Sequence, residues 1–170
     1  HFFVYPSHQI RYITLLLNNV RSRLKVLIID DHEMNVTLLK NLMMAKVQDC
    51  ETFCYTESAV ALTWCEENEP DLVLVDYMMP APNGLEFIER FRKLNGKRDI
   101  PVVMITAVNE KDIRLKAIEL GANDFINKPI DTAELTARVR NMLALRKSQK
   151  ALANRAEWLA EEVRKATAEI

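Results

Sequence analysis

The chain has 170 residues, of which 49% are hydrophobic and 28% charged, a composition that supports a packed core and excludes wholesale disorder. Its 23 lysine and arginine residues nearly balance 24 aspartate and glutamate residues, so we expect no direct nucleic-acid binding. The three glycines, Gly84, Gly96 and Gly121, form neither a G-x-G-x-x-G turn nor a G-x-x-x-x-G-K phosphate loop.

The first 23 residues differ from the rest of the chain. They are rich in aromatic residues and arginine, contain no acidic residue, and begin with His1. We interpret 1–23 as a native N-terminal arm, an expression remnant or part of a truncated upstream region, and expect it to be partly disordered or irregularly packed.

From Leu24 onward, short apolar runs alternate with amphipathic segments. The runs predict strands at 25–29, 51–55, 72–75, 102–105 and 124–126. The segments between them predict helices at 33–47, 57–68, 84–95 and 110–120, and a fifth helix from 131. Asn109 and Gly121 are expected to cap the two ends of the fourth helix, and the segment 131–134 resembles a capping box. Five β–α repeats predict a doubly wound α/β domain with a parallel sheet over 24–145.

The fifth helix is predicted to continue to the C-terminus as a coiled-coil linker over 146–170. A heptad pattern places Leu145, Leu152, Leu159 and Ala166 at d, and Met142, Gln149, Ala156, Val163 and Ile170 at a. Leucine at d with one polar residue at a favours a two-stranded coil. We therefore expect a homodimer through 142–170 that leads to an output domain; the alternative is a solitary, solvated helix.

The cysteines and the length of the longest apolar run near the N-terminus indicate the cellular compartment in which the protein works. Cys50, Cys54 and Cys65 contain no C-x-x-C pair, which disfavours a disulfide framework or a structural zinc site. The apolar run 13–17 is too short for a membrane span or a secretory signal. We expect packed thiols in a cytoplasmic protein that has no membrane segment.

Polar residues follow four of the five predicted strands. Asp30 and Asp31 follow the first strand, Asp76 the third, Thr106 the fourth and Lys128 the fifth. The carboxyl ends of strands in an open parallel sheet meet at one edge, where such folds bind their ligands. The five side chains are therefore expected to form one site.

The charges of this site predict its chemistry. Two carboxylates about 4 Å apart repel by roughly 4 kcal/mol at an effective dielectric of about 20, so they stay ionised together only beside cations. A hard divalent ion, Mg²⁺, suits such oxygen ligands. With Lys128 it would neutralise a phosphoryl group. Asp76, between the acidic pair and Lys128, is the expected nucleophile.

Five motifs in order resemble the receiver domains of bacterial two-component response regulators. They are Val-Leu-Ile-Ile-Asp-Asp at 26–31, Val-Asp-Tyr-Met-Met-Pro at 75–80, Gly84, Ile-Thr-Ala at 105–107 and Asn-Lys-Pro at 127–129. The resemblance covers about 24–145 and implies a flavodoxin-like, CheY-like fold with strand order 2-1-3-4-5. It also implies that a histidine kinase or phosphotransfer protein phosphorylates Asp76.

The same resemblance implies the ligands of the metal and of the phosphoryl group. Asp31, Asp76 and the backbone carbonyl of Met78 would bind Mg²⁺ directly, and Asp30 would act mainly through water. Thr106 and Lys128 would hold the phosphoryl oxygens.

Further features follow from the resemblance. Phe125 would change rotamer together with Thr106, and the Lys128–Pro129 bond would be cis. Met78 and Val108, two residues beyond Asp76 and Thr106, would flank the path of the hydrolytic water. Both side chains are apolar and cannot orient that water, which predicts slow autodephosphorylation. The turn Ala-Pro-Asn-Gly at 81–84 departs from the family's usual pattern, but its asparagine can still cap the next helix.

The segments 62–66 and 98–101 resemble receivers that precede an HD-GYP cyclic-di-GMP phosphodiesterase. Neither His-Asp nor Gly-Tyr-Pro occurs in the chain, so that output domain is absent from it. We therefore expect a switch whose only chemistry is its own phosphorylation and dephosphorylation. The alternatives are a hydrolase of the haloacid dehalogenase type, although its Asp-x-Asp spacing differs from the adjacent Asp30 and Asp31, and a pseudo-receiver that acts as a dimeric scaffold.

Overall fold

In the computed structural model, which describes residues 9–11, 13, 14, 17, 22–107 and 109–169, five parallel strands form one sheet. The strands are β1 (Leu24–Ile29), β2 (Cys50–Tyr55), β3 (Leu72–Asp76), β4 (Val102–Thr106) and β5 (Asp124–Asn127). Their order is β2-β1-β3-β4-β5, and all four neighbouring pairs are parallel. The predicted fold class and strand order are confirmed.

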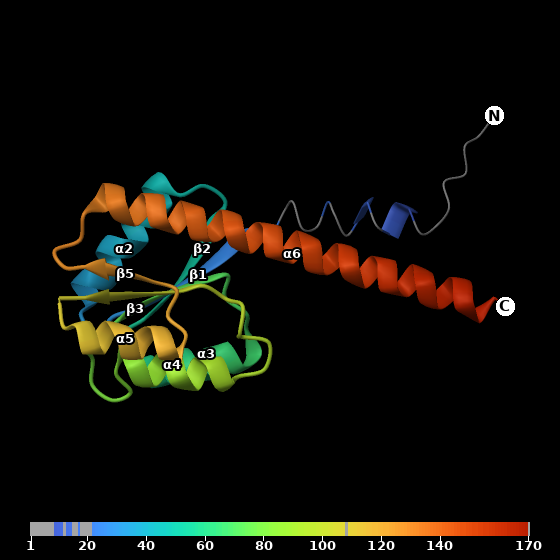
Figure 1. The fold of residues 1–170 in the computed structure, drawn as a ribbon. Helices are drawn as coiled ribbons and strands as arrows, with labels where there is room; N and C mark the ends of the chain where they lie inside the picture. The colour runs from blue at the N-terminus through green and yellow to red at the C-terminus, as the bar shows by residue number, and fades with distance from the viewer. Residues whose placement is uncertain (1–8, 12, 15–16, 18–21, 108, 170) are drawn as a thin grey trace. The chain divides into compact units, whose positions relative to one another are not determined.

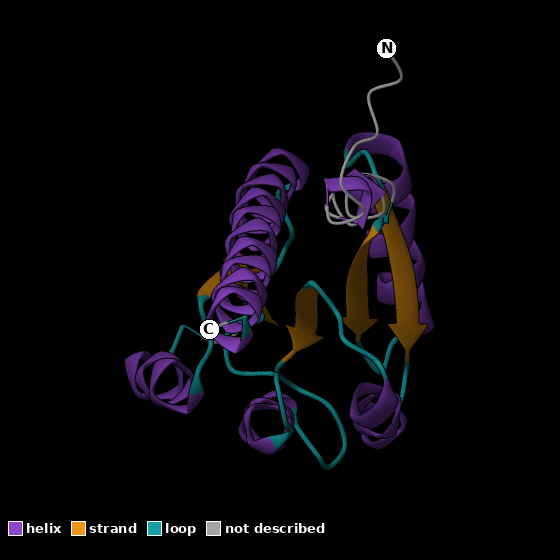
Figure 2. Ribbon diagram, turned by 90° about the vertical axis from the view of Figure 1, so that its right-hand side faces the viewer, coloured by secondary structure: helices purple, strands orange, loops and turns teal. Residues whose placement is uncertain are grey.

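Helices cover both faces of this sheet (Figures 1 and 2). They are α2 (Glu33–Lys46), α3 (Ser58–Glu67), α4 (Gly84–Lys93), α5 (Lys111–Leu120) and α6 (Thr132–Ala168). One face is covered by α2 and the first part of α6, and the other by α3, α4 and α5. Because helices lie on both faces, the central strands β3 and β4 are buried at every position, which explains their unbroken apolar runs.

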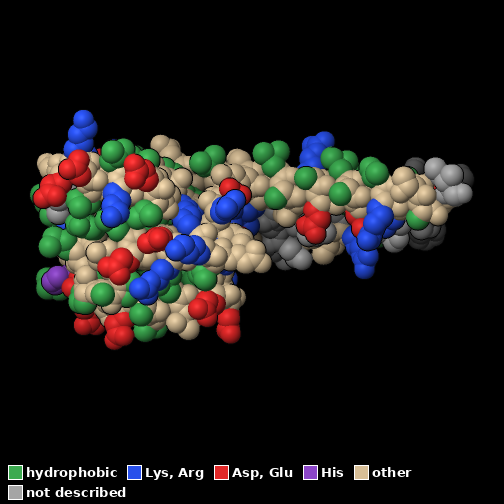
Figure 3. Space-filling view, turned by 60° about the horizontal axis from the view of Figure 1, so that its bottom comes forward, with side chains coloured by type: hydrophobic (Ala, Val, Ile, Leu, Met, Phe, Trp, Pro, Cys, Tyr) green, Lys and Arg blue, Asp and Glu red, His purple; other side chains and the backbone are tan. Residues whose placement is uncertain are grey.

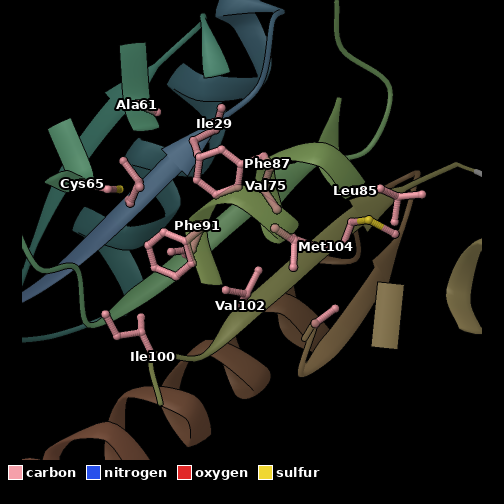
Figure 4. Packing of buried hydrophobic residues seen from close by; sticks show 14 of the residues in the cluster. Ile29, Ala61, Cys65, Val75, Leu85, Phe87, Phe91, Ile100, Val102 and Met104 are labelled. Carbon is pink, nitrogen blue, oxygen red and sulfur yellow. The ribbon is translucent and has the colours of Figure 1, made fainter. Parts of the chain in front are cut away.

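Two apolar clusters, one on each face of the sheet, make up the core. On the α3–α5 face, Phe87 and Phe91 of α4 stack with ring centroids 5.7 Å apart and lie among side chains of β3 and β4 (Figure 4). Cys65 is buried in this cluster, whereas Cys50 and Cys54 are half-buried and pack against the other cluster; none of the three forms a disulfide. The expected burial is therefore complete for Cys65 and partial for the other two.

The helix ends agree with the sequence signals in three of four cases. The Asn83 side chain accepts a hydrogen bond from the Glu86 amide at 3.0 Å, and Asp131 accepts from the amides of Ala133 and Glu134. Helix α5 ends at Gly121 in a left-handed conformation. The predicted cap at Asn109 is wrong. The capping position is residue 110, and the Asn109 side chain instead accepts a hydrogen bond from an arginine of α5.

The amino edge of the sheet is tied together by Arg92 of α4. Its Nη1 donates to the carbonyls of Lys97 and Ile100 at 2.6 Å each, and its Nε and Nη2 donate to the carbonyl of Gly121 at 3.2 and 2.7 Å. One side chain thus satisfies three carbonyl groups in two loops.

Substitution of Gly121 by alanine should destabilise this edge. Its φ of 112° is strained for any residue with a Cβ, and the added Cβ would lie 2.8 Å from Arg92 Nε. We expect Gly121→Ala to lower the free energy of unfolding by about 2 kcal/mol or more in urea titrations. Gly96→Ala is the matched control, because φ is also positive there (74°) but no heavy atom lies within 4 Å of the new Cβ. Equal losses in the two variants would show that the Arg92 contact is unimportant.

Helix α6 is anchored to the sheet near the residue at which it leaves the domain. Arg146, 7% exposed, donates from Nε to Asp71 Oδ1 at 3.3 Å and also contacts the Glu69 carboxylate. Asp71, 2% exposed, accepts in turn from the Lys25 amide at 2.8 Å. Earlier in α6, Met142, the first residue of the predicted heptad pattern, packs against the core.

The chain divides into two compact units, residues 24–146 and residues 1–23 with 147–170. In the second unit, the described residues 9–11, 13, 14 and 17 are helical, which corrects the expectation of irregular structure at those positions. The hydrogen bond from Arg164 lowers the pKa of Glu161. The positive charges of Arg164, Lys165 and Arg11 lower that pKa further.

Charges of both signs are interspersed on the face shown in Figure 3, as the near-zero net charge leads one to expect. Among the described residues, no helix combines the length and the apolar character that a membrane crossing requires.

Candidate functional site

The predicted site lies at the carboxyl edge of the sheet, where the strand register brings its residues together. Asp76, the last residue of β3, pairs with Ile105 of β4, and Thr106, the last residue of β4, pairs with Asn127 of β5. The Lys128 amide then donates to the Thr106 carbonyl at 2.9 Å. The parallel ladder thereby aligns three of the predicted residues.

Asp30 is held rigidly in the loop after β1. Its side chain is 3% exposed; Oδ1 accepts from the His32 amide at 2.9 Å, and Oδ2 accepts from Asn35 Nδ2 at 3.0 Å. Asp31 is a quarter exposed, and its Oδ1 lies 3.0 Å from His32 Nδ1. The two adjacent carboxylates thus differ in environment, since Asp30 is buried with a hydrogen bond at each oxygen and Asp31 is partly exposed to solvent.

Lys128 joins the two buried carboxylates. Its Nζ lies 2.8 Å from Asp76 Oδ1 and 3.6 Å from Asp30 Oδ2. Burial raises the pKa of Asp76; the hydrogen bond from Lys128 opposes this shift, and the charges of Asp30 and Asp31 add to it. Burial lowers the pKa of Lys128, but the hydrogen bonds and charges of Asp76 and Asp30 outweigh it and raise that pKa overall.

The loop after Asp76 depends on the absence of a side chain at Gly84. A Cβ there would lie 2.6 Å from the Asp76 carbonyl oxygen and 2.8 Å from Tyr77 Cα. The Gly84 amide also donates to the Tyr77 carbonyl at 2.9 Å, and the Tyr77 amide donates to the Ile105 carbonyl at 2.9 Å. The start of α4 therefore packs directly against the backbone of Asp76.

Phe125 and Thr106, the predicted switch pair, lie on the neighbouring strands β5 and β4. Thr106 is buried, and Phe125 is half-buried on the α3–α5 face of the sheet. The guanidinium carbon of Arg114 in α5 lies 5.7 Å from the centroid of the Phe125 ring. Arg114 also donates to the side chains of Asn109, at 3.3 Å, and Asn127. One arginine thus connects the aromatic ring, the end of β5 and the loop after β4.

Five predicted residues gather at this edge: Asp30, Asp31, Asp76, Thr106 and Lys128. Met78 is 65% exposed, and Val108 lies outside the described residues. The Lys128–Pro129 bond is cis, as expected, and Ala81–Pro82 is cis as well. Sequence reasoning missed His32, whose ring lies beside Asp31; the signal available was its position directly after the acidic pair.

The donor set of the site suits a hard divalent cation. Asp30, Asp31 and Asp76 offer carboxylate oxygens, the type of ligand that Mg²⁺ prefers. Among the described residues, Lys128 is the one lysine or arginine within salt-bridge distance of Asp30 or Asp76, so these carboxylates outnumber the ammonium that they share. The site therefore keeps an excess of negative charge that a cation would offset.

Comparisons with known proteins agree with this geometry. The family model of the response regulator receiver domain matches residues 26–140. The cyclic di-GMP phosphodiesterase response regulator RpfG of Xanthomonas campestris pv. campestris is 39% identical over 133 residues, 78% of this chain and 35% of its own length. The response regulator PleD of Caulobacter vibrioides is 36% identical over 118 residues, 69% of this chain and 26% of its own length. The chain therefore spans about a third or less of the length of these relatives.

Solved structures show the same fold. A crystal structure of a putative response regulator from Chloroflexus aurantiacus J-10-fl has a TM-score of 0.66 and 28% identity, and covers 72% of this chain and 98% of its own. A doubly wound domain with carboxylates, a threonine and a lysine at the carboxyl edge of its sheet belongs to the class of α/β proteins that bind their ligands at that edge. Within that class, the chain belongs to the response regulator receiver domain family of two-component signalling.

Proposed function

We propose that this domain is a signalling switch that accepts a phosphoryl group on Asp76. The contact between Lys128 Nζ and Asp76 Oδ1 at 2.8 Å carries the proposal. It places a cation beside the carboxylate at the sheet edge where β1, β3, β4 and β5 deliver their polar residues. Lys128 has a raised pKa and so stays protonated at neutral pH, where it can balance charge on a transferred group.

In the proposed transfer, Asp76 is the nucleophile and the other residues of the site hold the phosphoryl group and the ion. A carboxylate oxygen of Asp76 forms a bond to phosphorus as the bond from phosphorus to the donor's leaving group breaks, and the leaving group departs with that electron pair. Lys128 and the Thr106 hydroxyl hold the phosphoryl oxygens. Asp31, Asp76 and the Met78 carbonyl would hold Mg²⁺, assisted by Asp30, and the ion would neutralise phosphoryl charge.

The partners that we propose are a histidine kinase or phosphotransfer protein upstream and an output domain downstream. The similarity to RpfG supports an output connected with cyclic di-GMP. We further propose the division into an arm (1–23), the receiver (24–145) and a helical linker (146–170) that pairs two chains. The lack of a disulfide between any of the three cysteines supports the reducing cytoplasm as the compartment.

Labelling with acetyl phosphate tests the proposed function. The full chain, incubated with acetyl phosphate and Mg²⁺, should gain the mass of one phosphoryl group per chain, and removal of Mg²⁺ by a chelator should abolish the gain. Turnover of a generic phosphate ester without a stable adduct would instead indicate a hydrolase. The absence of both labelling and turnover would leave only a pseudo-receiver.

The phosphorylated state should be long-lived. Met78 is exposed beside Asp76 and apolar, and Val108 is apolar too, so neither side chain can orient water by a hydrogen bond. We expect Met78→Asn with Val108→Glu to accelerate phosphoryl loss by up to about 10²-fold, the lower end of the contribution of a positioned polar group. A quenched time course followed by intact mass measures this, with Met34→Asn, an exposed position on α2, as the control. Unchanged or slower loss in the double variant would contradict the proposal.

A further inference from the structure

His32 places an imidazole at the edge of the acidic pair. Its ring is 70% exposed, and Nδ1 lies 3.0 Å from Asp31 Oδ1 and 3.5 Å from Asp30 Oδ1. His32 occupies the capping position of α2, but its side chain makes no capping hydrogen bond. Its backbone amide donates to Asp30 Oδ1 at 2.9 Å, which fixes the backbone of His32 next to the carboxylates.

The shortest of these separations is a hydrogen-bonding contact between the His32 ring and Asp31, and its length also equals the spacing of two neighbouring ligands of one ion. Two ligand atoms about 2.1 Å from a metal and at right angles to each other are roughly 3.0 Å apart. The possible ligand atoms of Asp30, Asp31 and His32 all lie within 4.8 Å of one another. No large rearrangement of the loop after β1 is needed for all three to reach one ion.

The two oxygens of Asp30 have separate neighbours. Oδ2 faces Asn35 at 3.0 Å and Lys128 at 3.6 Å, whereas Oδ1 faces His32. An ion held by Asp31 and Asp76 that also takes His32 Nδ1 would therefore approach Asp30 from its Oδ1 side and leave the contact between Lys128 and Asp30 Oδ2 in place. Its coordination requires Nδ1 without its proton, and the proton then resides on Nε2.

We propose that His32 Nδ1 is a nitrogen ligand of the metal site and makes the site select divalent first-row transition metals over Mg²⁺. The inference rests on the proposed metal site at Asp30, Asp31 and Asp76. Imidazole nitrogen binds transition metals well, whereas Mg²⁺ favours oxygen. The added ligand therefore raises the affinity for Mn²⁺ and heavier divalent ions and leaves the affinity for Mg²⁺ almost unchanged.

Mn²⁺ alone is a suitable probe. Pulsed electron paramagnetic resonance of Mn²⁺ bound to the full chain should show hyperfine coupling to an imidazole nitrogen. The coupling should vanish in His32→Asn, a substitution that keeps a good helix-capping residue, and in His32→Ala. The control is the double variant His1→Ala with His8→Ala, which removes the other two histidines and should retain the coupling.

Affinities complete the test. His32→Asn should bind Mn²⁺ at least about tenfold more weakly, while its affinity for Mg²⁺ changes less than about twofold. Mn²⁺ that binds the wild-type chain without nitrogen coupling would overturn the role of His32 and leave the carboxylate site standing. If Mn²⁺ and Mg²⁺ both fail to bind, the proposed metal site and the role of His32 are both wrong.

Discussion

Asp76→Asn should abolish phosphoryl labelling by acetyl phosphate, because the amide of asparagine is a poor nucleophile while its shape preserves the packing. Intact mass spectrometry should find the adduct in the wild-type chain and none in the variant. Asp31→Asn should slow labelling by about 10²-fold or more, because it removes a metal ligand and leaves the acceptor in place.

The control for labelling is Asp99→Asn, a change at an exposed carboxylate that should label as the wild-type chain does. Equal labelling of Asp76→Asn and wild type would show that another residue is the acceptor. Labelling that survives in Asp76→Asn at a reduced level would point to the neighbouring Asp30 or Asp31, and peptide mapping would locate it.

The Asp76→Asn variant should also fold at least as stably as the wild type at neutral pH. Burial raises the pKa of Asp76 in the folded chain, so this residue's contribution to stability is greatest at low pH and is lost as pH rises through the folded pKa. The variant lacks that loss. As pH increases from about 4 to 7, the free energy of unfolding of the variant should therefore decline less, or rise more, than that of the wild type. A variant less stable than the wild type at pH 7 would contradict the raised pKa of Asp76.

Charged substitutions at the apolar a and d positions of α6 should convert the proposed dimer into a monomer. Leu145, Leu152, Leu159 and Val163 are between 47% and 69% exposed, and leucine at successive d positions is the pattern of a two-stranded coil. We expect the full chain to sediment as a dimer and Leu152→Lys with Leu159→Lys to sediment as a monomer, because each lysine would place a charge in the apolar seam.

A matched control is available on the same helix. Ala144→Lys with Ala151→Lys adds the same charge at two exposed positions outside the a and d seam and should leave the dimer intact. A wild-type chain that sediments as a monomer, with or without beryllofluoride, would contradict the pairing model. Beryllofluoride should change the dimer only if it interacts differently with two states of the domain.

The strands and most of the site could be predicted because their signals are local. An unbroken apolar run marks a strand that is buried on both faces, and the polar residue at its end marks the carboxyl edge, so Asp30, Asp76, Thr106 and Lys128 follow from spacing alone. Asn83 and Asp131 were predictable as caps because each bonds an amide within three residues.

The remaining features depend on contacts between residues distant in sequence. Asn109 is a good capping residue by type, but Arg114 binds its side chain and the helix begins one position later. Arg92 and Arg146 read as ordinary surface arginines, yet each binds groups that the fold brings from other loops. His32 carries only a weak sequence signal, its position directly after the acidic pair, because a single histidine has no metal-binding spacing of its own.

The close approach of Gly84 to Asp76 makes the two sides of the site mechanically unequal. On one side, the backbone of Asp76 and Tyr77 is pressed against α4 with no room for a methyl group and is bonded to β4. The backbone of Asp76 and Tyr77 therefore cannot move towards α4 when a phosphoryl group adds bulk and charge. On the other side, the loop after Thr106 is tied to α5 through the Arg114 side chain, which is far easier to rearrange than backbone in contact with backbone. The displacement caused by phosphorylation should therefore run in one direction, towards β4, β5 and α5, while the backbone beside α4 stays in place.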